Sequence, residues 1–208
     1  YITSNIMLNL KELLNPHSFL FIQDPTSKKM VFDKLCSEAF EKYNIDKNLL
    51  LNNLIKREKI GSTTLGNGIA IPHVQNDQVI KPCCIVAILS DGLDFDALDN
   101  NPVDLIVFLI LPEVSKPENL QILAQIYRLL RDTEITDKLR GCKSEESAFA
   151  IISEHLKNKA WIEKDELAIA LAAGRYASMK LTQLTGEEST KKFINECINT
   201  TLKKNILK

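Results

Sequence analysis

The chain has 208 residues, which is enough to bury a core, and a single domain of ordinary size is the default expectation. Its 26 basic and 27 acidic residues nearly cancel, which excludes the strongly basic surface that binding to nucleic acid or to an anionic membrane requires. Hydrophobic residues make up 45% and charged residues 25% of the chain, a composition typical of soluble globular proteins.

The cysteines and the apolar segments favour a cytoplasmic protein. The five cysteines include no CxxC pair, and an odd number favours free thiols in a reducing compartment. The longest apolar run, residues 103–111, is interrupted by Asp104 and is too short to cross a bilayer. Residues 1–7 lack the basic flank and apolar core of a secretory signal. We therefore expect no insertion into a membrane.

The first part of the chain predicts a strand followed by two helices. The apolar and aromatic run at residues 18–22 predicts the strand. Asp24 and Pro25 suit the N-cap and the first position of a helix, which apolar residues at helical spacing extend over residues 26–43. Asp46 can cap the second helix.

The middle of the chain predicts the centre of a sheet. Glycines and hydroxyl residues interrupt the pattern over residues 61–68, and residues 69–71 resume as a short strand. Residues 83–89 and 103–111 are apolar on both faces, as in central strands that are covered by helices on each side. From Pro117 onward the pattern is helical. These elements predict an α/β fold, in which a mixed β-sheet is flanked by helices on both faces.

A lysine-containing stretch at residues 157–159 is the one candidate domain boundary. We expect a domain over residues 7–157 and an appended helical tail over residues 158–208. In the tail, Thr185 and Glu188 match a capping box.

The chain has three histidines, and one of them stands out. His17 follows Asn15 and Pro16 in an expected loop, and His155 lies on a helix end with polar neighbours, so surface or capping roles are expected for both. His73 instead ends the short strand that follows the glycine-rich segment.

The residues before this histidine can surround an anion. Gly66 and Gly68 permit positive φ and let backbone amides approach an anion closely. Ser62 and Thr63 offer hydroxyl donors, and Arg57, sixteen residues before the histidine, can reach it as a forked cation. The alternative is a strand that ends in a capped turn, with the histidine bonded to a backbone carbonyl. Spacing alone leaves both interpretations open.

Three segments resemble one known family. The sequence Gly66-Asn-Gly-Ile-Ala-Ile-Pro-His73, preceded by Arg-Glu-Lys at 57–59 and Ser-Thr at 62–63, resembles the phosphorylation-site signature of fructose/mannitol-class phosphotransferase IIA domains. Residues 95–105 resemble the stretch ahead of their central strand, and residues 119–125 lie where the family begins its next helix. The resemblance covers about residues 7–156. It runs closest to the nitrogen-regulatory branch, whose domain stands alone rather than fused to a sugar permease.

The resemblance implies that His73 accepts a phosphoryl group from a histidine phosphocarrier protein. Arg57 matches the family arginine that lies by the site, and the same mixed sheet is implied. The further donors to the phosphoryl oxygens would be the hydroxyls of Ser62 and Thr63 and the amides of the turn at Gly66 and Gly68. No cofactor is implied, and no metal-ligand spacing occurs among the histidines, cysteines and acidic residues.

The chain departs from the family pattern at three positions. Thr64 and Val74 stand where the family usually has glycine. Asn119 stands where it usually has a histidine, at the start of the helix after the central strand. An amide can still donate a hydrogen bond to His73 or to a phosphoryl oxygen, but it cannot carry charge. We therefore include Asn119 in the candidate site, with a helix cap as the alternative.

Two functions follow from the resemblance. In the first, phosphorylation of His73 is a regulatory switch that changes which protein the domain binds, and the regulated partner is unidentified. In the second, the domain passes the phosphoryl group to a fructose/mannitol-type sugar permease. The absence of a permease segment from the sequence, the substitution at Asn119 and the tail favour the first.

Overall fold

The computed structural model describes residues 10–114, 117–158 and 166–206. Within these ranges six strands form one sheet: β1 (Phe19–Ile22), β2 (Thr64–Gly66), β3 (Ile69–Ala70), β4 (His73–Asn76), β5 (Cys83–Leu93) and β6 (Val103–Pro112). The strand order is β1-β5-β6-β3-β2, and β4 also pairs with β6. Strands β3 and β4 run parallel to β6, whereas β5 runs antiparallel to it. The sheet is therefore mixed.

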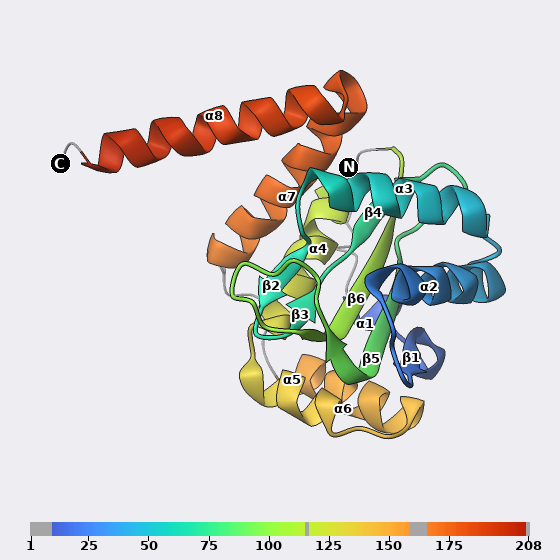
Figure 1. The fold of residues 1–208 in the computed structure, drawn as a ribbon. Helices are drawn as coiled ribbons and strands as arrows, with labels where there is room; N and C mark the ends of the chain where they lie inside the picture. Colours follow the sequence, from blue (N-terminus) through green and yellow to red (C-terminus); the bar gives the residue numbers. More distant parts are fainter. Residues whose placement is uncertain (1–9, 115–116, 159–165, 207–208) are drawn as a thin grey trace, which may run out of the picture.

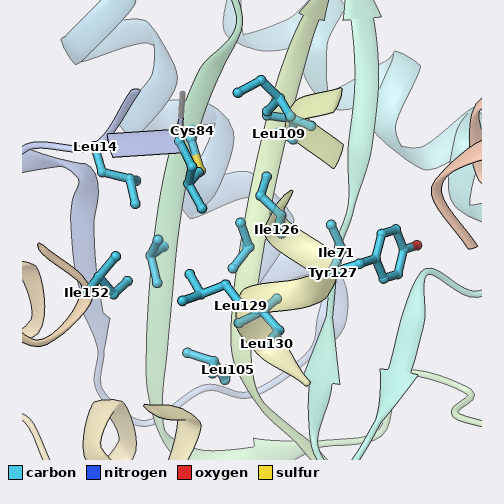
Figure 2. Packing of buried hydrophobic residues seen from close by; sticks show 14 of the residues in the cluster. Leu14, Ile71, Cys84, Leu105, Leu109, Ile126, Tyr127, Leu129, Leu130 and Ile152 are labelled. Carbon is cyan, nitrogen blue, oxygen red and sulfur yellow. The ribbon is translucent and has the colours of Figure 1, made fainter. Parts of the chain in front are cut away.

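Helices cover both faces of this sheet (Figure 1). On one face, α2 (Lys28–Tyr43) and α3 (Lys47–Ile60) pack against alternate residues of β6, Ile106 and Phe108 among them. Leu105 and Leu109 of β6 point to the opposite face. The described helices that contribute to the core on that face are α1 (Leu10–Leu13), α4 (Pro117–Leu130), α5 (Thr133–Arg140), α6 (Glu145–Asn158) and α7 (Glu166–Thr185). Figure 2 shows Leu105 and Leu109 with the leucines and isoleucine of α4. The predicted fold class is confirmed.

The helix starts depend on single capping residues. Asp46 caps α3 as predicted, because its Oδ1 accepts a hydrogen bond of 2.7 Å from the amide of Leu49. The first long helix begins at Lys28, two residues after the predicted start at residue 26, and its N-cap lies three residues after the predicted one. Ser27, not Asp24, is the N-cap of α2, and its Oγ accepts from the amide of Met30 at 3.2 Å. Asp24 has a φ of 47°, outside the extended region that an N-cap adopts.

His73 lies within the sheet rather than at its rim. The predicted strand at residues 69–71 ends at Ala70, and the chain re-enters the sheet at His73 as β4. Pro72 has no amide hydrogen to continue a ladder, but its carbonyl oxygen accepts from the amide of Leu109 at 2.9 Å. Because β4 then pairs with β6 as far as Asn76, the histidine begins a strand instead of ending one.

The C-terminal helices meet at a glycine. Gly186, with a φ of 82°, separates α7 from α8 (Glu187–Ile206), which projects away from the sheet (Figure 1). The predicted capping box is not formed, because Thr185 ends α7 and its hydroxyl donates to the carbonyl of Leu181 at 2.9 Å. The predicted domain boundary falls at the end of α6, and residues 159–165 lie outside the described ranges.

Two further findings concern the cysteines and the helices. The cysteines that the structure describes, Cys36, Cys83, Cys84 and Cys142, are free thiols. Of the helices in the described part of the chain, none combines the length and the apolar character that a membrane span requires.

Candidate functional site

His73 has a defined tautomer in a fully buried position. Its side chain is 0% exposed, and it pairs with Leu109 in the sheet. The ring atom Nδ1 lies 2.8 Å from the carbonyl oxygen of Ile71. Because a carbonyl oxygen only accepts hydrogen bonds, this contact assigns the ring proton to Nδ1. The lone pair of the neutral ring is then on Nε2, which is the nucleophilic nitrogen.

Arg57 places a cation at this nitrogen. It lies in the last turn of α3, is 6% exposed, and its Nη2 is 3.4 Å from Nε2 of His73. Its Nη1 donates to the carbonyl oxygen of Gly61 at 3.1 Å, which fixes the direction of the guanidinium. Its Nε is buried without a hydrogen-bond partner in the described structure. The predicted pair of His73 and Arg57 is therefore brought together.

A second arginine, which the sequence analysis missed, reaches the same place from α7. Arg175 donates through Nη1 to the carbonyl oxygen of Ser62 and through Nη2 to that of Thr64, the latter at 2.9 Å. No motif surrounds Arg175. The one available signal is the run of small residues at 172–174, since small side chains let a helix approach a neighbouring backbone closely.

Burial and these two cations keep His73 neutral. Burial lowers the pKa of His73 well below 6.5, and the charges of Arg57 and Arg175 lower it further, against the hydrogen bond that its Nδ1–H donates to the carbonyl oxygen of Ile71. Burial also lowers the pKa of Arg57 to about 10, with Arg175 as the second cause and Glu58 opposing both. Two guanidinium groups and a neutral imidazole make a site that favours an anion.

The hydroxyls of Ser62 and Thr63 do not point at His73. Ser62 Oγ donates to the carbonyl oxygen of Phe95 at 2.8 Å, and Thr63 Oγ1 donates to Oε2 of Glu58 at 2.9 Å. In this conformation both hydroxyls therefore donate to other protein groups. The departure at Thr64 has a local explanation, because its buried Oγ1 accepts from Ser62 Oγ at 3.2 Å.

The sheet register places Gly66 and Gly68 away from His73. The two glycines, with φ of 96° and 74°, form the turn between β2 and β3. Ile69 pairs with Leu105 of β6, whereas His73 pairs with Leu109, so the turn and the histidine are roughly 13 Å apart along the strands. The turn instead packs on a different part of the molecule, where a Cβ at Gly68 would lie 3.0 Å from Arg140, Asp104 and Pro102.

The family of the chain follows from comparison with known proteins. The model of the family described as "Phosphoenolpyruvate-dependent sugar phosphotransferase system, EIIA 2" matches residues 12–155. The chain belongs to this family. The resemblance seen in the sequence is thereby confirmed, and α7 and α8 lie outside the residues that the family model matches.

Relatives of this IIA chain include regulatory and sugar-specific proteins. A nitrogen regulatory protein from Pseudomonas aeruginosa is 37% identical over 147 residues, which are 70% of this chain and 96% of the relative. A fructose-specific EIIA component from Haloferax volcanii is 30% identical over 133 residues, 64% of this chain and 86% of the relative. The crystal structure of the nitrogen regulatory protein IIA-Ntr from Neisseria meningitidis superimposes with a TM-score of 0.63 at 29% identity, covering 68% of this chain and 97% of that one.

Asn119 holds the connection between β6 and α4 of this IIA fold. It is 1% exposed and third in α4, and its Nδ2 donates to the carbonyl oxygens of Pro112 at 3.5 Å and Val114 at 3.4 Å. Its position is thus inside the helix rather than at the cap. The other departure from the family pattern, Val74, is buried against the α2–α3 face of the sheet. Within the described ranges, no three histidine, cysteine or acidic side chains are grouped as a metal site would need.

The role of Asn119 can be tested through the pH dependence of phosphorylation. We expect Asn119→His to add a titration near neutrality to the rate at which His73 accepts phosphate, because a second imidazole changes charge there and an amide does not. We expect Asn119→Ala to reduce stability by about 0.5–1.5 kcal/mol through its lost hydrogen bonds. The measurements are single-turnover phosphorylation against pH and thermal unfolding. Superimposable pH profiles for the native chain and Asn119→His would leave Asn119 a purely structural role.

Proposed function

We propose that this IIA chain carries a phosphoryl group on Nε2 of His73 and acts mainly as a regulatory switch of the nitrogen-regulatory type. The observation that supports this most is the buried, neutral imidazole, whose Nδ1 proton is held by Ile71 and whose Nε2 faces Arg57. A nucleophilic nitrogen needs its lone pair free of a proton, and this arrangement supplies it at neutral pH.

The transfer itself needs little from the protein beyond position and charge. The Nε2 lone pair attacks the phosphorus of the donor's phosphohistidine, the N–P bond of the donor breaks, and the donor imidazole leaves with that electron pair. The Nδ1 proton of His73 stays on its bond to Ile71, whose carbonyl stabilises the positive charge that develops on the ring. Arg57 donates to the phosphoryl oxygens as their charge passes to the new site.

A histidine phosphocarrier protein is the donor in this proposal, and the target is an unidentified regulated protein. Two observations favour regulation. The nitrogen regulatory relative aligns over 96% of its own length. The buried amide of Asn119, where the family usually has a histidine, cannot titrate.

A sugar-specific role is the second candidate. The relative from Haloferax volcanii is named a fructose-specific EIIA component, and its alignment includes most of its length. In this alternative, His73 passes its phosphoryl group to a fructose/mannitol-type sugar permease domain.

The proposal is tested by incubating the full chain with enzyme I, the phosphocarrier protein and phosphoenolpyruvate, and measuring its mass. We expect a gain of one acid-labile phosphoryl group, lost when the phosphocarrier is omitted. Absence of the gain in an otherwise active mixture would contradict the proposal. Adding a fructose- or mannitol-type permease domain to the labelled chain separates the two roles, because rapid loss of the label to that domain would favour sugar transport.

A further inference from the structure

Helix α7 lies against the site although it is outside the residues that the family model matches. It runs alongside α4 (Figure 1), and its Ala172 and Met179 are buried in the same core as Tyr127 of α4. Its Arg175 reaches the backbone of the segment between α3 and β2, at Ser62 and Thr64. The helix is thus anchored on both sides of the space above His73.

The nucleophilic nitrogen is covered in this arrangement. His73 is 0% exposed, and Arg57, which contacts its Nε2, is 6% exposed. The charge of Arg175 on α7 lowers the pKa of His73, as expected for a helix that packs near the ring. A protein donor must bring its phosphorus into bonding contact with Nε2, and this nitrogen has no free approach.

Two cavities lie beside α7, and Arg57 contributes to the wall of each. One, of about 360 Å³, has Arg57, Gln75 and Met179 in its wall, and the other, of about 310 Å³, has Arg57, Gly61 and Arg175. Arg57 therefore lines both cavities. With α7 displaced, they would join into a single depression above Arg57 and His73, where a partner protein could dock.

We propose that α7 is an autoinhibitory cap on His73, held closed by Arg175, and that it must leave the site before the phosphocarrier can donate. This inference rests on the proposed function of His73 as phosphoryl acceptor and adds the regulation of that site. Charge repulsion destabilises the closed state, because Arg175 and Arg57 are both positively charged and Arg175 lowers the pKa of Arg57.

Phosphorylation and opening are then coupled. The closed site has no exposed surface at His73 into which a phosphoryl group could be added. A chain that carries the group therefore keeps α7 displaced, and displacement of α7 also moves α8, which packs on it. The position of these two helices is the signal that a regulated partner would distinguish.

The test uses the full chain and a small reagent in addition to the phosphocarrier. Diethyl pyrocarbonate modifies unprotonated histidine nitrogens, and peptide masses give a separate rate for each histidine. His17, whose side chain is 86% exposed, is the internal reference. We expect His73 of the native chain to react at least tenfold more slowly than His17, because a closed site is open only a small fraction of the time.

The variant Arg175→Met removes the charged fork and keeps an apolar stem. We expect it to raise both the modification rate of His73 and its initial rate of phosphorylation by roughly tenfold to a hundredfold, as the loss of hydrogen bonds from a charged group would. For Arg175→Lys, we expect both rates to lie between those of Arg175→Met and those of the native chain. The matched control is Lys192→Met, which removes an exposed basic side chain of α8 and should change neither rate. Thermal unfolding shows whether each variant is folded.

Three results would overturn the cap. They are native His73 reacting as fast as His17, Arg175→Met leaving both rates unchanged, and Arg175→Met slowing phosphorylation, which would make Arg175 a ligand of the phosphoryl group. Failure of the proposed function looks different: the modification rate of His73 would rise in Arg175→Met, as expected for a cap, while neither chain accepted phosphate.

Discussion

Replacing His73 by alanine is expected to abolish phosphorylation of this chain completely. In His73 a proton is held on one ring nitrogen and a guanidinium lies at the other. His17 is exposed beside Glu145, and His155 lies 4.0 Å from Asp132, so each has a carboxylate neighbour that would repel a phosphoryl group. The measurement is the acid-labile mass gain after incubation with enzyme I, phosphocarrier and phosphoenolpyruvate.

The matched controls are His17→Ala and His155→Ala, which should keep the full mass gain. Since His73→Ala removes a buried side chain, its thermal unfolding must be compared with that of the native chain before loss of label is interpreted. Persistence of the label in folded His73→Ala would falsify the assignment of the acceptor.

The sheet could be predicted because the pattern along its central strands is simple. Strand β6 is apolar at successive positions from Leu105 to Leu111, and the structure divides these residues between two cores. A strand that is apolar on both faces is stable mainly in the centre of a sheet, where helices cover both of its faces. The start of α2 was misplaced because Asp24 and Ser27 are both good N-cap residues, and the sequence does not show that Asp24 takes a φ of 47° while Ser27 caps the helix.

The site was predictable where one local motif specified it and not where the fold brought distant residues together. The pair of Arg57 and His73 follows from the family signature. Gly66 and Gly68 belong to the same signature, yet each residue of an extended strand adds about 3.3 Å, so the glycine turn and His73 are roughly 13 Å apart along the sheet. Arg175 reaches the site only because α7 packs on α4, a contact that no local pattern encodes.

Replacing Arg57 by alanine is expected to slow the phosphorylation of His73 by roughly tenfold to a hundredfold, since a hydrogen bond from a charged group contributes about 1.5–3 kcal/mol. The guanidinium is 3.4 Å from Nε2, close enough to donate to a phosphoryl oxygen as the new bond forms. The measurement is the single-turnover rate at saturating phosphocarrier. Lys56→Ala, which removes the neighbouring cation on α3, is the matched control and should leave the rate within about twofold, as expected for a surface charge.

The pH dependence of this rate tests whether Arg57 also keeps His73 neutral. Burial and Arg57 lower the pKa of His73 well below 6.5, so the native rate should stay constant as the pH falls from 7.5 through 6.5. Without Arg57 one of these causes is removed and the pKa rises. Protonation of Nε2 occupies the attacking lone pair, so the Arg57→Ala rate should begin to fall at a higher pH than the native rate does. If the two profiles are parallel and the rates equal, Arg57 is a buried structural cation. The neutral state of His73 then depends only on burial and on the hydrogen bond to Ile71.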